Sequence, residues 1–142
     1  PRAQPGNQRP RLFRDPDRFS LFNRMGFNSP GAETVARNVA NARRNGALPE
    51  NFRIGINLGK NKDTSAELAY QDYRDAVKPF AGLADYLVIN VSSPNTPGLR
   101  ALQTVESITK IVEAVRVECA KWPTVPPIYL KLAPELSGEA LE

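Results

Sequence analysis

Histidine is absent from this 142-residue sequence, and cysteine occurs only once, at Cys119. The absence of imidazole excludes Ser-His-Asp and Cys-His nucleophile systems and every zinc site that needs a histidine ligand. A single cysteine excludes a disulfide framework and a four-cysteine metal site, and it is typical of a reducing compartment. We therefore expect no bound metal and no histidine-based catalysis.

Long hydrophobic runs are absent as well. No apolar stretch approaches the ~18 residues that a membrane span requires, and the N-terminus lacks the charged-then-apolar pattern of a signal peptide. The net charge of +4 comes from residues 1–30, where six arginines oppose two aspartates, because 13 basic and 13 acidic residues balance in the remainder. Short arginine-rich stretches are more often solvated coil than phosphate-binding surfaces, so we expect no nucleic-acid partner.

After an N-terminal segment without a sustained period, residues 1–30, hydrophobic periodicity predicts alternating helices and strands. The motif Thr64-x-x-Glu67 matches a capping box and predicts the start of the second helix. The run from Tyr86 to Val91 is apolar on both sides, which is typical of a central parallel strand covered by helices. The predicted helices span residues 32–45, 64–80 and 104–121, with the first turn of another at 137–142, and the predicted strands span residues 52–57, 86–91 and 128–132.

Alternating strands and helices predict an α/β fold with βαβ units and a parallel sheet. Asn57, Asn90 and Lys131 each fall at or near the C-terminal end of a predicted strand. A (β/α)8 barrel builds its site from several strand ends, whereas an open sheet concentrates ligand contacts at one switch point. We therefore predict a partial barrel of about three βα units, since a whole one needs about 250 residues. Both ends are expected to continue in the natural protein, with 1–30 as an irregular segment of the barrel domain and 31–142 as its central units.

The segment from Asn90 to Arg100 carries two amides and two adjacent hydroxyls in a loop restrained by Pro94 and Pro97. Carboxamides supply a donor and an acceptor without charge, which suits a ring such as a pyrimidine-dione, whose edge alternates N–H and C=O. Proline lowers the entropy that is lost in holding such a loop. The alternative interpretation is that Asn, Ser, Pro and Gly are ordinary turn residues, and composition alone does not decide between the two.

Two further clusters attract interest. Residues 23–28 place two amides around Gly26 and Phe27, although a single Phe is commonly plain core. Lys131 alternates with its neighbours in the strand 128–132 so that its side chain should point into the barrel, where an unpaired ammonium is costly. Its partner would be a reduced flavin, a substrate carboxylate or an acidic residue in a structural salt bridge.

Five segments carry a resemblance that spacing alone does not supply. They are Arg9-Pro-Arg-Leu-Phe-Arg14, Asn23-Arg-Met-Gly-Phe-Asn28, Asn57-Leu-Gly-Lys-Asn-Lys-Asp-Thr64, Asn90-Val-Ser-Ser-Pro-Asn-Thr-Pro-Gly-Leu-Arg100 and Leu130-Lys-Leu-Ala-Pro134. Together they resemble the quinone-dependent, class 2 dihydroorotate dehydrogenases, in the family's order and across the whole chain. Ser93 stands at the base position, where the soluble class 1 enzymes carry a cysteine.

This resemblance implies roles for individual residues. Ser93 would be the general base that takes the C5 proton of dihydroorotate while a hydride passes from C6 to N5 of FMN; without a histidine it would depend on a water chain. The substrate ring would be bound by the amides of Asn23, Asn90 and Asn95, with Gly26 and Phe27 in the same wall. The cofactor FMN would be contacted by Asn57, Asn90 and Lys131, with Lys131 placed to stabilise negative charge on the reduced flavin.

The resemblance also implies a function for the longer protein: oxidation of dihydroorotate to orotate in de novo pyrimidine biosynthesis, with the electrons passed to a quinone. Membrane-associating helices outside this sequence would place the enzyme at a bacterial cytoplasmic membrane or the mitochondrial inner membrane. Residues 1–142 alone are expected to be inactive, since the FMN phosphate would be bound beyond them. Two alternatives stay open: another FMN barrel oxidoreductase, of the class 1 dihydroorotate or dihydropyrimidine type, and a non-catalytic segment with only a ligand-binding loop.

Overall fold

The structure is a computed structural model that describes residues 1–49, 51–93 and 98–135. The predicted alternation of helices and strands is confirmed from residue 31 onward, and the helix predicted at 137–142 lies outside the described residues. In chain order the elements are β1 (Leu12–Asp15), β2 (Ser20–Asn23), α1 (Ala32–Arg44), β3 (Gly55–Leu58), α2 (Ala69–Val77), the 3₁₀ helix η1 (Lys78–Phe80), β4 (Tyr86–Asn90), the 3₁₀ helix η2 (Arg100–Leu102), α3 (Val105–Cys119) and β5 (Ile128–Lys131).

The strands β3, β4 and β5 form a parallel sheet with β4 in the centre. The central position expected for the apolar run that begins at Tyr86 is therefore confirmed. In the register, Asn57 lies opposite Val88, and Asn90 lies opposite Lys131. Because the strands are parallel, their carboxyl ends meet at one edge of the sheet, as the partial-barrel prediction requires.

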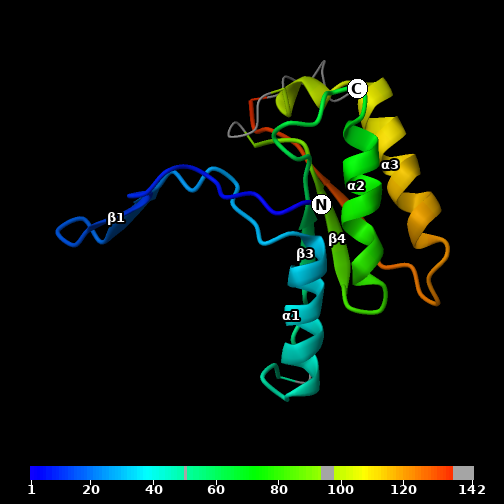
Figure 1. Cartoon of the computed structure of the whole chain (residues 1–142), viewed down its shortest axis with the longest axis horizontal. Coiled ribbons are helices and arrows are strands. Elements are labelled where there is room, and N and C mark those ends of the chain that lie inside the picture. Colours follow the sequence, from blue (N-terminus) through cyan, green and yellow to red (C-terminus); the bar gives the residue numbers. More distant parts are fainter. Residues whose placement is uncertain (50, 94–97, 136–142) are drawn as a thin grey trace.

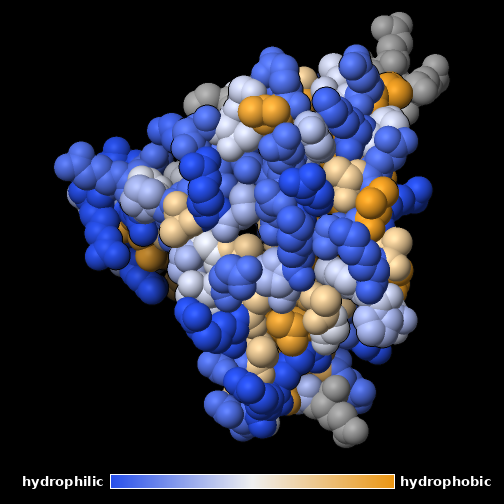
Figure 2. Space-filling view, turned by 45° about the vertical axis from the view of Figure 1, so that its right-hand side comes forward, coloured by the Kyte–Doolittle hydropathy of each residue, from blue (hydrophilic) through white to orange (hydrophobic). Residues whose placement is uncertain are grey.

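The helices α2 and α3 lie side by side and cover one face of this sheet (Figure 1). Leu87 and Ile89 of the central strand point to this face and are fully buried. The helix α3 begins with a side-chain cap, because the Thr104 hydroxyl accepts a hydrogen bond of 3.2 Å from the Ser107 N–H. Figure 2 shows hydrophobic residues on the outer surface as separate patches among hydrophilic ones. In α3, the apolar side chains of Ile111, Val115 and Cys119 are buried in the core.

The opposite face of the sheet is not covered by any helix in the described part of the chain. The Tyr86 ring lies across Gly55 at the amino end, so closely that any side chain on Gly55 would overlap it. Tyr86 also meets Tyr129 of β5 edge to face, with 5.8 Å between ring centroids. Parallel sheets are normally covered on both sides. This open face therefore corresponds to the interior of the predicted barrel.

Residues 12–23, which were expected to be irregular, form an antiparallel hairpin of β1 and β2. The hairpin projects away from the helices (Figure 1), and Phe13 lies opposite Phe22 on it. Its turn is closed by a hydrogen bond of 3.2 Å from the Phe19 N–H to the Pro16 carbonyl. The two strands are only four residues each, too short for a periodic signal, which explains why the pattern did not reveal them.

The helix α2 begins at Ala69, so the capping box predicted at Thr64-x-x-Glu67 is wrong. Thr64 lies in the loop before the helix, where its carbonyl accepts a hydrogen bond from the Lys60 ammonium. A side-chain hydrogen bond from Ser65 to Glu67 lowers the pKa of that exposed carboxylate. Local hydrogen bonds of the loop have thus replaced the helix cap.

Candidate functional site

An open hollow of about 640 Å³ lies at the carboxyl edge of the sheet. Its volume is within the range of small-molecule sites. Of the residues predicted to form the site, four line it together, and they come from the end of β4, the end of β5 and the segment before α1. The lining residues are Phe27, Asn90, Ser92, Ser93, Lys131, Leu132 and Pro134.

The side chain of Asn90 is fixed by the residues that follow it. Its Oδ1 atom accepts hydrogen bonds from the backbone N–H of Ser92 at 3.0 Å and from the Ser92 hydroxyl at 2.9 Å. This Asx-type turn occupies the oxygen, and no described residue accepts a hydrogen bond from the amide nitrogen of Asn90, which lines the hollow. Asn90 can therefore donate hydrogen bonds to a ligand carbonyl.

Ser93 follows in the same turn and is buried, with 9% of its surface exposed. The preceding peptide group is held by Arg100, whose Nε donates to the Ser92 carbonyl at 3.1 Å. Arg100 thus connects the start of this loop with its return to η2. Asn95, predicted to bind the substrate ring, lies outside the described residues.

Lys131 and Asn57 lie on the open face of the sheet with Asn90. In the register Lys131 pairs with Asn90, and residues paired in this way project to the same side. The side chain of Lys131 thus has the predicted phase, but it is exposed rather than buried, because the face of the sheet is not covered. No ion pair of Lys131 occurs within the described residues. Its ammonium remains accessible to an anionic ligand.

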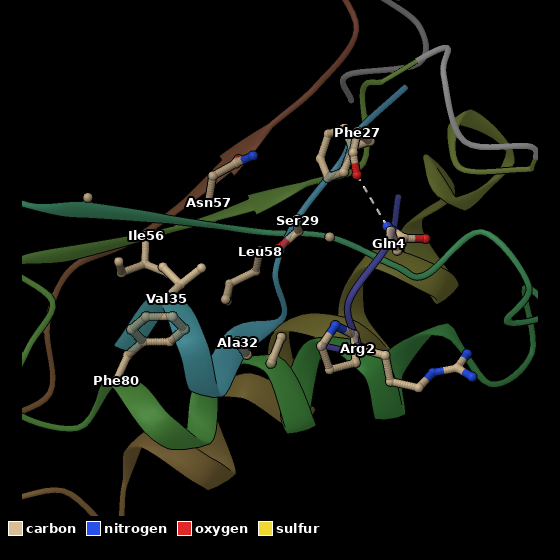
Figure 3. A pocket seen from close by; sticks show the side chains of 14 residues that line it. Arg2, Gln4, Phe27, Ser29, Ala32, Val35, Ile56, Asn57, Leu58 and Phe80 are labelled. Atoms are coloured by element: carbon tan, nitrogen blue, oxygen red, sulfur yellow. Dashed lines mark hydrogen bonds between the residues drawn. The ribbon is translucent and has the colours of Figure 1, made fainter. Parts of the chain in front are cut away.

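Phe27 is the link between the N-terminal segment and the sheet. It has a positive φ of 59°, and its carbonyl accepts a hydrogen bond of 3.4 Å from Gln4 (Figure 3). Its ring lies against Gly59, where an added Cβ would come within 3.0 Å. Figure 3 shows Asn57 on the same side of β3 as Phe27, whereas Ile56 and Leu58 point to the other side. Phe27 and Asn57 also line a smaller cavity of about 210 Å³ next to the hollow.

Asn23 and Gly26 are not among the residues that line the hollow. Asn23 ends β2 and is exposed, and its Oδ1 accepts a hydrogen bond of 3.4 Å from the Met25 N–H. Gly26, with a φ of +72°, packs closely against Asn7, so a larger residue would clash there. Both lie at the base of the hairpin, and their predicted contact with the substrate stays a prediction.

The electrostatics of the site favour a polar ligand with partial negative charge. The lining residues include amide and hydroxyl groups and the Lys131 ammonium, but no carboxylate. The single thiol lies elsewhere, and burial in the core raises the pKa of Cys119 to about 11, which makes it a poor nucleophile. Among the described residues, no group of three or more His, Cys, Asp or Glu side chains is arranged to bind a metal ion.

The sequence profile described as Dihydroorotate dehydrogenase matches residues 1–142. The chain belongs to the dihydroorotate dehydrogenase family. It is 49% identical over its whole length to the dihydroorotate dehydrogenase (quinone) of Anaeromyxobacter dehalogenans strain 2CP-C, and 48% identical over its whole length to that of Myxococcus xanthus strain DK1622. Over 98% of the chain it is 50% identical to the enzyme of Mycobacterium bovis strain BCG / Pasteur 1173P2.

Solved structures show the same relationship. The crystal structure of the dihydroorotate dehydrogenase of Eimeria tenella in complex with ferulenol matches 99% of the chain with a TM-score of 0.84 at 36% identity, and the ligand-free form matches with a TM-score of 0.81 at 37% identity. These matches confirm the predicted partial barrel. The chain spans 36–38% of the length of the curated dihydroorotate dehydrogenases named above and 42–43% of the Eimeria chains.

Several residues at this site received no role from sequence reasoning. Arg100 occurs in a segment on which the family resemblance rests, but only the structure shows that it holds the Ser92 carbonyl. Leu132 and Pro134 follow β5 and form an apolar side of the hollow. Side chains alternate between the two faces along β5, and this alternation places Leu132 on the face that the helices cover. The sequence therefore contained no signal that Leu132 would line the hollow.

Proposed function

We propose that this chain is the central part of a quinone-dependent dihydroorotate dehydrogenase, which oxidises dihydroorotate to orotate with FMN as cofactor. The observation that supports this most strongly is the hollow at the carboxyl edge, where Asn90, Ser93 and Lys131 come together in a member of the dihydroorotate dehydrogenase family. Dihydroorotate is a carboxylate that carries a pyrimidine-dione ring, so amide donors beside a cationic side chain match its chemistry.

The residues present also fit FMN. Its ring system has a pyrimidine-dione edge of carbonyl and N–H groups, and Asn57 and Asn90 offer neutral amides on the open face of the sheet. Lys131 offers a positive charge next to Asn90 without a competing ion pair among the described residues. When bound, FMN would accept the hydride of the oxidation. We assign Asn57, Asn90 and Lys131 to hold it.

Within this proposal the chain binds the substrate and removes one proton. Asn90 donates to a ring carbonyl, Phe27 packs against the ring, and Ser93 takes the proton from C5 of dihydroorotate. The sheet and the Asn90–Ser92 turn hold these groups before the substrate arrives, which reduces the entropy that is lost on reaching the transition state. Asn23, Gly26 and Asn95 complete the predicted substrate site.

The electron acceptor and the location of the whole protein belong to the same proposal. Relatives named dihydroorotate dehydrogenase (quinone) support a quinone as acceptor, and we place the whole protein at a membrane surface, as the family resemblance implies. Among the residues that the structure describes, no helix is long and apolar enough to cross a membrane.

The test is anaerobic mixing of the full-length, FMN-loaded protein with dihydroorotate. We expect the flavin absorbance to bleach in a single turnover with one equivalent of orotate formed, and a soluble quinone to restore the absorbance. A dihydropyrimidine without the carboxylate serves as the control substrate and should bleach it far more slowly. Absence of bleaching by dihydroorotate in folded, flavin-loaded protein would refute the proposal.

A further inference from the structure

Two consecutive residues of α2, Asp72 and Tyr73, contact the loop after β3 and the end of β4. Both lie in the middle of the helix and are buried, Asp72 with 9% and Tyr73 with 0% of the surface exposed. Successive residues on a helix point about 100° apart. One helix can therefore reach the ends of two neighbouring strands at once.

The Tyr73 hydroxyl contacts the end of β4. It donates a hydrogen bond of 2.8 Å to the backbone carbonyl of Asn90, at a fully buried position. Burial raises the pKa of the phenol far above its ordinary value, although contact with the Lys60 backbone opposes this rise. Tyr73 therefore stays protonated and remains a donor at any physiological pH.

The Asp72 carboxylate contacts the loop after β3. Its Oδ2 accepts a hydrogen bond of 2.8 Å from the Asn61 N–H. The neighbouring Lys60 is buried with 3% of its surface exposed, and its ammonium donates to the carbonyls of Asn61 and Thr64. Burial lowers the pKa of Lys60, and the charge of Asp72 opposes this. The carboxylate thus fixes this loop both by a hydrogen bond and by its charge.

We propose that Asp72 and Tyr73 are positioning residues that hold the carboxyl ends of β3 and β4, and with them the amides of Asn57 and Asn90. This inference rests on the proposed function, in which Asn57 contacts FMN and Asn90 contacts both FMN and the substrate. Asn57 lies on β3, four positions before Asn61, and Asn90 is the last residue of β4. The sheet pairs Asn57 with Val88 and ends at the pair of Leu58 and Ile89, so the residues that follow β3 are held by the contacts of Asp72.

The two positioning residues therefore have different reach. Tyr73 contacts Asn90 and also the Lys60 backbone after β3, so its effect should fall on both substrate and flavin. Asp72 acts on the loop after Asn57, so its effect should fall on the flavin alone. A residue that merely stabilises the fold would not separate substrate kinetics from flavin affinity in this way.

The test uses Tyr73→Phe and Asp72→Ala in the full-length, FMN-loaded protein. At saturating FMN, we expect Tyr73→Phe to lower kcat/KM for dihydroorotate about tenfold, since small displacements of reacting groups have effects of this size. We expect Asp72→Ala to raise the Kd of FMN about tenfold, the range of one lost hydrogen bond, and to leave the KM for dihydroorotate of the saturated enzyme unchanged.

The same helix supplies matched controls. Tyr70→Phe removes a hydroxyl that, among the described residues, accepts from Gln71 alone. Asp75→Ala removes a carboxylate that pairs with Arg74 and Lys78 on the helix surface. Both should leave Kd and KM at their wild-type values. Thermal unfolding of all four variants reports losses of stability.

This inference is overturned if both Tyr73→Phe and Asp72→Ala keep the wild-type kcat/KM and FMN Kd and lose only melting temperature. If either variant fails to fold, the other still tests the inference, because only Tyr73 contacts Asn90 and only Asp72 contacts the Asn61 N–H. If the wild-type flavin is not reduced by dihydroorotate, the proposed function fails instead. The FMN Kd of Asp72→Ala against that of Asp75→Ala then still tests the positioning of Asn57.

Discussion

Replacing Ser93 by alanine should stop the reaction with little change in ligand binding. Among the residues that line the hollow, no carboxylate or imidazole is present to take over the proton. The other hydroxyl there, that of Ser92, is already committed to Asn90 Oδ1 at 2.9 Å. Among the described residues that line the hollow, the proton of dihydroorotate would therefore have no alternative acceptor.

The magnitude follows from these contacts. A general base contributes about 10²–10⁴ in rate, which corresponds to about 2.7–5.4 kcal/mol of activation free energy. Ser92→Ala removes only one of two hydrogen bonds to Asn90 Oδ1, since the backbone N–H remains at 3.0 Å. One such bond contributes about 0.5–1.5 kcal/mol, so this control should slow the reaction about tenfold at most.

The assay is the single-turnover rate of flavin reduction, measured with orotate affinity on the same samples. Ser93→Ala should fall at least one order of magnitude below Ser92→Ala and bind orotate nearly as the wild type does. Ser93→Cys should retain activity with a pH optimum shifted toward about 8.5, the ordinary thiol pKa. Equal rates for Ser93→Ala and the wild type would show that the proton leaves by another route.

Three further outcomes are expected. Lys131→Met should lower the flavin reduction potential by about 20 mV, the equivalent of ~1 kcal/mol for a charge at ~4 Å in water, whereas an unchanged potential in a redox titration would remove Lys131 from the flavin site. The pKa of Asp85 is lowered, first by a hydrogen bond from the Ile54 N–H and then by one from Arg43. Its contribution to the free energy of unfolding is therefore present above its ordinary pKa of 3.8 and is lost as the pH falls through the lower folded value. Acid unfolding of Asp85→Asn should lack this component. Residues 1–142 alone should neither quench FMN fluorescence nor oxidise dihydroorotate, because both outer strands and one sheet face are uncovered; a cooperative monomer that quenches the flavin would contradict this.

The regular part of the fold was predictable because its apolar positions recur with clear periods. In β4, Leu87 and Ile89 are fully buried at the centre of the sheet, and an apolar run of this kind indicates a covered parallel strand. The helix from Val105 to Cys119 was bounded by a capping threonine and a later proline. These signals are local, and the tertiary structure agrees with them.

The start of α2 was predicted wrongly because side chains bind backbone groups of the loop before this helix. The ammonium of Lys60 binds the Thr64 carbonyl, and Asp72 binds the Asn61 N–H. A capping-box pattern shows neither contact, so the start of α2 was placed five residues early. The hairpin was missed for a different reason, because its signal consists of the turn residues Pro16 and Asp17 between two short apolar pairs.

The site was predictable in outline from the strand ends, but its orientation was not. Polar residues at or near the carboxyl ends of β3, β4 and β5 indicated a shared edge, and the structure brings Asn90, Ser93 and Lys131 to one hollow there. The sequence contains no signal that Tyr73 would hold the Asn90 carbonyl, because its position on the apolar stripe of α2 is typical of a core residue. The hydrogen-bond partner of a tyrosine hydroxyl in the core can be identified only from the tertiary structure.

The open face of the sheet changes in character along the strands, and this gradient supports the proposed ligand site at the carboxyl edge. At the amino end, Tyr86 and Tyr129 pack edge to face, and Gly55 makes room for the Tyr86 ring. At the carboxyl end, Asn90 and Lys131 are paired neighbours. A planar ring that enters from this edge meets hydrogen-bond donors first, with aromatic side chains deeper in the sheet. The strands therefore supply both a polar rim that orients the ring and an apolar floor that limits its depth.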